Sequence, residues 1–316
     1  MLSRIANHLF WMGRYLERSE HMMRFIEVHY MASLDAPKEQ EREIALESIL
    51  NMVGAYELYF QQYETINENQ VLDFCTLDKK NNLSLMNVVS LMRENARAVR
   101  DKLSTESWEA INLFYHSLND IAIRKNPGKE QIPQLYQHVI NYTYIIKGIF
   151  DNTLLRNEVW QFVSLGLHLE RCIQISRSIS IKMKDISRID SSEGEGSIDS
   201  YHWSNLLKSA CGYDMSRQVY KLVPNKKHAI EFLVLNNKFP NAVLLNLEMI
   251  SYLLDAVNQK KIEDKNSLEF FVSKLSNTIK YLTIDEINGK EEHFINELIL
   301  KLYAIGNMIE QKYLMY

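Results

Sequence analysis

Apolar side chains recur at every third or fourth position along almost the whole chain, and this period is the strongest constraint on its fold. At the N-terminus, Leu2, Ile5, Leu9, Met12 and Leu16 would share one face of a helix. Similar periods predict further helices over about 39–64, 83–103, 105–123, 131–151, 156–184, 201–219, 240–259, 266–281 and 291–314. We find no alternating run typical of a strand. The sequence therefore predicts an all-α protein, built as a helical bundle.

Helix-breaking residues are scarce, which supports long helices. The 316 residues contain 5 prolines and 10 glycines, against average usages of about 5% and 7%. The prolines fall between the expected helices or at their starts, where a helix tolerates them: Pro37, Pro127, Pro133, Pro224 and Pro240. The stretch 187–200, SRIDSSEGEGSIDS, has the composition of an exposed linker loop.

Charge and cysteine usage limit the class of protein. A net charge of −4 gives no reason to expect nucleic acid or an anionic membrane as a partner. The cysteines Cys75, Cys172 and Cys211 are widely separated, as in a reducing compartment. The N-terminus lacks the apolar run of a signal peptide, and the apolar stretch 242–257 is interrupted by Glu248. We expect a cytoplasmic protein that does not cross a membrane.

Two stretches in different halves of the chain are nearly identical in pattern. GRYLERSEHMMR at 13–24 and GLHLERCIQISR at 166–177 share the glycine, the leucine, the Glu-Arg pair and the final arginine, 153 residues apart. Further matches follow in the same order at separations of 157 and 158 residues, pairing Leu50, Tyr56, Tyr63 and Phe74 with Leu207, Tyr213, Tyr220 and Phe232. We interpret this as an internal duplication. The predicted repeats are 1–152 and 153–316, packed as one body about a pseudo-two-fold axis.

The Glu-Arg pair lies on helices expected to be buried. Neighbouring residues on a helix point about 100° apart, so Glu17 and Arg18 need partners elsewhere. Contacts across a pseudo-two-fold axis are reciprocal, which predicts pairs of Glu17 with Arg171 and of Arg18 with Glu170. Either these charges form a structural ion-pair network, or the arginines bind a carboxylate or phosphate. We expect Gly13 and Gly166 to permit close approach of helices.

The sequence contains no recognisable motif for metal binding, proteolysis or nucleotide binding. No glutamate has a histidine three residues later, as a di-iron bundle requires, and the metalloprotease and nucleotide-binding motifs are missing. We expect no metal and no cofactor, and we identify no catalytic residue. Trp108 is expected to pack in the core. Arg93, Arg97 and Arg100 form a basic helix stripe, either solvated or available to an acidic partner.

Four segments resemble the alpha-E family of bacterial helical proteins, which is named for its Glu-Arg motif. They are LSRIANHLFWMGRYLERSE, ENARAVRDKLSTESWEAIN, VWQFVSLGLHLERC and EFLVLNNKFPNAV. By position, the family's marked residues correspond to Arg14, Glu17, Arg18, Asn95, Arg97, Trp108, Glu170 and Arg171. The chain departs from the family at Leu167 and at Asn241-Ala242, where arginine and Arg-Ser are common.

The resemblance also implies partners. Such proteins are usually encoded beside a circularly permuted ATP-grasp ligase and a transglutaminase-like peptidase, so we expect these two as partners. We therefore expect a non-catalytic helical partner or scaffold of an ATP-grasp peptide or amide ligase system. The alternative is an enzyme, or a protein that binds a small anion or peptide, with its site at the paired Glu-Arg motifs.

Overall fold

The computed structural model describes residues 1–36, 38–123, 132–189, 195–258 and 264–315. Within these ranges the regular structure is helical and contains no strand, so the predicted all-α fold is confirmed. The chain divides into two compact units, Met1–Leu167 and His168–Tyr316, each with its own core. The repeat boundary at 152/153 remains a prediction from the sequence.

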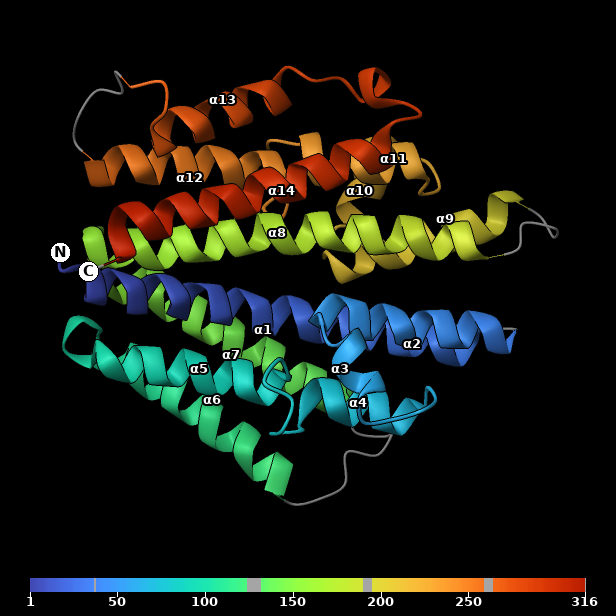
Figure 1. The fold of residues 1–316 in the computed structure, drawn as a ribbon, viewed down its shortest axis with the longest axis horizontal. Coiled ribbons are helices and arrows are strands. Elements are labelled where there is room, and N and C mark those ends of the chain that lie inside the picture. The colour runs from blue at the N-terminus through green and yellow to red at the C-terminus, as the bar shows by residue number, and fades with distance from the viewer. Residues whose placement is uncertain (37, 124–131, 190–194, 259–263, 316) are drawn as a thin grey trace. The chain divides into compact units, whose positions relative to one another are not determined.

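The first unit is organised around the long helix α1 (Figure 1). Its elements are α1 (Ser3–Asp35), α2 (Glu39–Val53), α3 (Tyr56–Phe60), α4 (Glu68–Thr76), α5 (Leu85–Ala98), a 3-10 turn (Arg100–Lys102), α6 (Thr105–Ile123) and α7 (Ile132–Thr153). Helices α2, α5 and α7 pack against α1, and α6 packs against α5 and α7. Because α1 has neighbours on several sides, its polar side chains as well as its apolar ones are buried, as predicted.

The second unit begins inside a long helix. Its elements are α8 (Glu158–Arg188), α9 (Glu195–Ser209), α10 (Tyr213–Tyr220), α11 (Lys226–Ile230), a π-helical turn (Glu231–Leu235), α12 (Val243–Asn258), α13 (Leu268–Lys280), a 3-10 turn (Ile284–Ile287), α14 (Glu291–Ile309) and a final π-helical turn (Glu310–Leu314). The linker expected over 187–200 is shorter than predicted, because α8 extends to Arg188 and α9 starts at Glu195. Residues 190–194 lie outside the described ranges.

The expected close approach of helices at two glycines is confirmed. A Cβ atom on Gly13 would overlap the carbonyl oxygen of Val163 and lie 3.3 Å from the amide nitrogen of Leu167. A Cβ atom on Gly166 would overlap the carbonyl oxygen of Phe10 and lie 3.0 Å from the amide nitrogen of Arg14. The start of α8 therefore crosses α1 backbone to backbone within the first unit, and any larger side chain at either glycine would force the two helices apart.

Local structure recurs in the two units at the separations seen in the sequence. Asn67 caps α4 and Asn225 caps α11, each through its side-chain oxygen and the backbone N–H three residues later. Gly54 and Cys211 both have positive φ after the second helix of their unit. Tyr63 meets Phe74 edge-on at 6.1 Å between ring centroids, and Tyr220 meets Phe232 at 6.4 Å. These similarities favour an internal duplication.

Candidate functional site

Helix α1 carries a stripe of buried ionisable side chains that includes the glutamate of the first Glu-Arg pair. Glu17, Glu20, His21 and Arg24 are each 5–8% exposed. Their spacing of three and four residues aligns them on one side of the helix with Gly13. Charges at this depth are tolerated only when they are paired and hydrogen-bonded.

Lys147 of α7 supplies a cation to this stripe. Its Nζ donates to Glu17 Oε2 at 2.5 Å and to Glu20 Oε2 at 2.6 Å. One lysine therefore joins two carboxylates that sit one helical turn apart. This contact ties α7 to α1 through the motif glutamate.

Arg24 continues the network along α1. Its guanidinium bonds to Glu20 Oε1 at 3.2 Å and donates to the hydroxyls of Tyr136 and Tyr144 on α7. The carboxylates of Glu17 and Glu20 thus lie beside the cations Lys147 and Arg24, and Arg24 also contacts the two tyrosine hydroxyls. The arrangement suits a structural ion-pair network, since each named charge has an opposite charge or a hydroxyl within hydrogen-bonding distance.

The two arginines of the first motif are more accessible than its glutamate. Arg14 and Arg18 are half-buried. The Arg14 guanidinium lies 4.5 Å from the Trp11 ring centroid, and that of Arg18 lies 5.6 Å from the Tyr15 ring centroid. Stacking on aromatic rings holds each guanidinium in place.

Three further predicted residues lie on α5 and α6. Asn95 bonds through Oδ1 to His8 Nδ1 at 2.9 Å and so joins α5 to α1. Arg97 is exposed and pairs with Glu94. Trp108 is only half-buried, so the prediction of core packing is wrong: its ring lies under the guanidinium of Arg100 at 5.2 Å.

The predicted basic stripe needs correction at its first member. Arg93 is not solvated, because its Nε donates to Asn112 of α6 at 2.8 Å and its guanidinium covers Tyr115 at 4.7 Å. Arg100 lies beyond the end of α5, in the 3-10 turn. Arg97 and Arg100 are therefore the exposed members of the predicted stripe.

In the second unit, the motif residues lie on α8. Glu170 is fully buried and accepts a hydrogen bond from Gln174 Nε2 at 2.6 Å. Arg171 approaches Asn246 Oδ1 at 3.5 Å, and His168 Nδ1 lies 2.7 Å from the same oxygen. The pairs of Glu17 with Arg171 and of Arg18 with Glu170, which would connect the two units, stay predictions.

A family model matches almost the whole chain. Residues 1–314 match the model of Alpha-E, described as a predicted alpha-helical domain with a conserved ER motif.

The chain belongs to the Alpha-E family.

No curated protein and no solved structure matches the chain.

The most informative partners of the Alpha-E motif were not predicted from the sequence. Lys147 is the only lysine or arginine in α7, and a single cation in a 22-residue apolar and aromatic helix is a signal that could have been noticed. Asn246 gives no comparable signal. It is buried, and its amide donates to the carbonyls of Pro240 and Ala242, which fixes the oxygen that faces His168 and Arg171.

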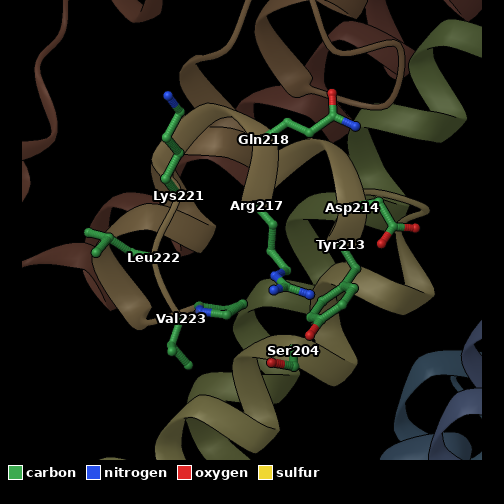
Figure 2. Close-up of a pocket in the computed structure, with 9 residues that line it drawn as sticks. Ser204, Tyr213, Asp214, Arg217, Gln218, Lys221, Leu222 and Val223 are labelled. Carbon is green, nitrogen blue, oxygen red and sulfur yellow. The ribbon is translucent and has the colours of Figure 1, made fainter.

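Two hollows lie on the second unit of the Alpha-E chain. One of about 720 Å³ is lined by Trp203, Lys226, Glu291 and His293, among others, and Lys226 and Glu291 form an ion pair. The other, of about 600 Å³, lies beside α10 (Figure 2). Neither of these hollows is lined by residues of the Glu-Arg motif.

The described part of the Alpha-E chain shows neither a metal site nor a membrane-spanning helix. The described residues contain no group of three histidine, cysteine or carboxylate side chains placed to hold a metal ion. Among the same residues, no helix combines the length and apolar character that a membrane crossing requires.

Proposed function

We propose that this Alpha-E protein is a non-catalytic helical partner of a circularly permuted ATP-grasp ligase that forms peptide or amide bonds. The bridge from Lys147 to Glu17 and Glu20 is the observation that carries the proposal. A motif carboxylate on α1 that pairs with a lysine on α7 holds the two helices together and so stabilises the bundle. It is poorly suited to act as a general base, because the side chain of Glu17 is buried and its Oε2 already accepts a hydrogen bond from Lys147.

The ligase and a transglutaminase-like peptidase enter this proposal through the family resemblance. A transient interface of about 1,200–2,000 Å² is sufficient for such docking. Arg97 and Arg100 are exposed, and the Arg100 guanidinium lies over the Trp108 ring. Arginine with an aromatic ring is a common combination in protein interfaces. This α5–α6 edge is the docking surface that we favour, for an acidic surface of the ligase.

We further propose that the chain arose by internal duplication. The repeated asparagine caps, positive-φ residues and Tyr–Phe ring pairs support it. Duplication explains why the Glu-Arg pair is present twice, and the reciprocal pairs with Arg171 and Glu170 belong to this proposal.

The second candidate function is binding of a small ligand at Arg14 and Arg18. Their half-buried guanidinium groups, stacked on Trp11 and Tyr15, could bind a small anion or the carboxylate of a peptide. In that case the Glu-Arg region is a ligand site, with or without catalysis.

The test combines an association measurement with a turnover measurement. Binding kinetics of the Alpha-E protein with the neighbouring ligase are recorded at about 50 mM and about 300 mM salt, which change the screening length. We expect Arg97→Glu with Arg100→Glu to slow association at low salt, whereas Arg4→Glu, at another exposed arginine, leaves it unchanged. Lack of binding by the unsubstituted protein would refute the proposal.

The purified protein alone is then incubated with ATP and with peptides. We expect no turnover. Turnover that is lost in Arg18→Ala would favour the enzyme, and saturable binding of a small anion that is lost in the same variant would favour the ligand-binding protein.

A further inference from the structure

The hollow beside α10 is formed by a helix end and the turn that follows it. Helix α10 stops at Tyr220, and Lys221 adopts positive φ while its N–H donates to the carbonyl of Arg217. The chain then turns back through Leu222 and Val223 to the buried Pro224. The hollow has a volume of about 600 Å³, within the range of ligand pockets, which is about 300–1,000 Å³.

Arg217 is the charged group directed into this hollow. Figure 2 shows its guanidinium beside the ring of Tyr213, with Ser204 next to the phenol and Val223 on the opposite side. The Tyr213 ring centroid lies 5.7 Å from the Arg217 guanidinium and 5.6 Å from Lys208 Nζ. The ring therefore positions Arg217, and two cations raise the positive potential there.

Among the residues that the structure describes, this arginine has no acidic partner. Across the described ranges, neither Arg217 nor Lys221 forms an ion pair. Asp214 also lines the hollow, but its carboxylate points away from the guanidinium. An exposed arginine without a carboxylate retains all five donors for a ligand.

One side of the hollow is apolar. Leu222 and Val223, which line it, are 59% and 67% exposed. Single exposed apolar residues are ordinary on protein surfaces, but two in succession beside an arginine without an acidic partner form a mixed patch of the kind that binds partners. A small inorganic anion would use only the arginine and leave this apolar side in water.

We propose that the hollow binds a short acidic peptide segment of a partner protein. A carboxylate side chain accepts the paired donors of Arg217, and neighbouring apolar side chains of the peptide cover Leu222 and Val223. The net positive charge of Arg217, Lys208 and Lys221 complements the acidic peptide. This inference does not depend on the ligase, because Arg97 and Arg100 do not line the hollow.

The experiment uses the full chain and a fluorescein-labelled peptide with the core Leu-Glu-Leu-Glu-Leu, followed by fluorescence anisotropy. We expect saturable binding that weakens severalfold when salt is raised from about 50 mM to about 300 mM. Arg217→Gln should weaken binding at least about tenfold, since it removes a charge-assisted pair of hydrogen bonds. Replacing the glutamates of the peptide with glutamine should have an effect of similar size.

Matched variants separate the hollow from the general surface. Arg4→Gln removes an exposed arginine elsewhere and should leave binding unchanged. Leu222→Ser should weaken binding severalfold, whereas Leu300→Ser, at a leucine that is 63% exposed on α14, should not. Circular dichroism melts of all variants should coincide with that of the unsubstituted protein, because none of these side chains is buried.

Several outcomes would overturn the proposal. They are absence of binding, equal losses in Arg217→Gln and Arg4→Gln, equal affinity for the glutamate and glutamine peptides, or binding only to vesicles of anionic phospholipid. None of these results bears on the ligase experiment above, so the two proposals fail separately.

Discussion

Single residues decide how the charges of the Glu-Arg region are held. Glu17 and Glu20 are both buried, and Lys147 bridges them. Removing one partner of a buried pair leaves an uncompensated charge, whereas removing a partner of an exposed pair costs little. The same side-chain chemistry therefore has very different effects in the core and on the surface.

Lys147→Met should destabilise the protein by about 3–5 kcal/mol, since it keeps the length of the side chain but leaves two carboxylates without their shared cation. Urea unfolding measures the free energy. Lys280→Met provides the control, because Lys280 pairs with Glu248 at the surface, and it should cost less than about 1 kcal/mol. Equal losses for the two variants would mean that the Lys147 bridge is solvated.

A second residue-scale prediction concerns pH. Burial, and then the charge of Lys182, lower the pKa of His202 from its ordinary 6.5 to about 4. As pH falls from about 6.5 towards 4, the unfolded chain takes up this proton and the folded protein does not, so stability decreases. His202→Gln should flatten this part of the stability profile. His116→Gln, at an exposed histidine, should not, and the same slope in all three proteins would contradict the assignment.

At the scale of elements, the crossing of α1 and α8 depends on two glycines. Their missing side chains allow backbone atoms of the two helices to touch. Glycine inside a helix costs about 0.5–1 kcal/mol relative to alanine, so it is retained where packing requires it. The chain provides a contrasting case at Gly148, on α7, where a Cβ would meet nothing within 4 Å.

Gly13→Ala and Gly166→Ala should each destabilise the protein by about 1–3 kcal/mol, because the added methyl group must push a backbone away. Gly148→Ala should instead stabilise it by about 0.5–1 kcal/mol, through helix propensity alone. Thermal and urea unfolding of the three variants give the comparison. Stabilisation by all three would show that the helices do not cross at these glycines.

On the scale of the whole molecule, the two units share a plan of a long first helix, a second helix ended by a positive-φ residue, and an asparagine-capped fourth helix. If they are copies of one ancestral unit, equivalent positions should respond alike to substitution. The caps at Asn67 and Asn225 allow this to be measured, since both lie at the starts of short helices.

Asn67→Ala and Asn225→Ala should each cost about 1 kcal/mol, because each removes the acceptor for one backbone N–H at a helix start. Differential scanning calorimetry of both variants tests the equivalence. An experimentally determined structure in which α1–α5 do not superpose on α8–α12 would refute the duplication, whatever the calorimetry gives.

The sequence by itself determined the helices, the buried character of α1 and the close approach at Gly13 and Gly166. These features depend on the helical period and on one residue type, which act over a few neighbouring positions. Even so, several boundaries differ: the helix expected over 201–219 is broken into α9 and α10. Cys211, which has positive φ, lies at the break. The hydrophobic period does not reveal that a residue leaves the helical conformation at this position.

Only the tertiary structure decided which groups hold the Glu-Arg region together. Lys147 reaches Glu17 from 130 positions away, and Asn246 reaches Arg171 from 75 positions away. It likewise places Arg93 in contact with Asn112 of α6, so that this arginine does not belong to a solvated stripe. The physical reason is that a helix fixes the direction of each side chain locally, whereas the partner that it meets depends on how distant helices pack.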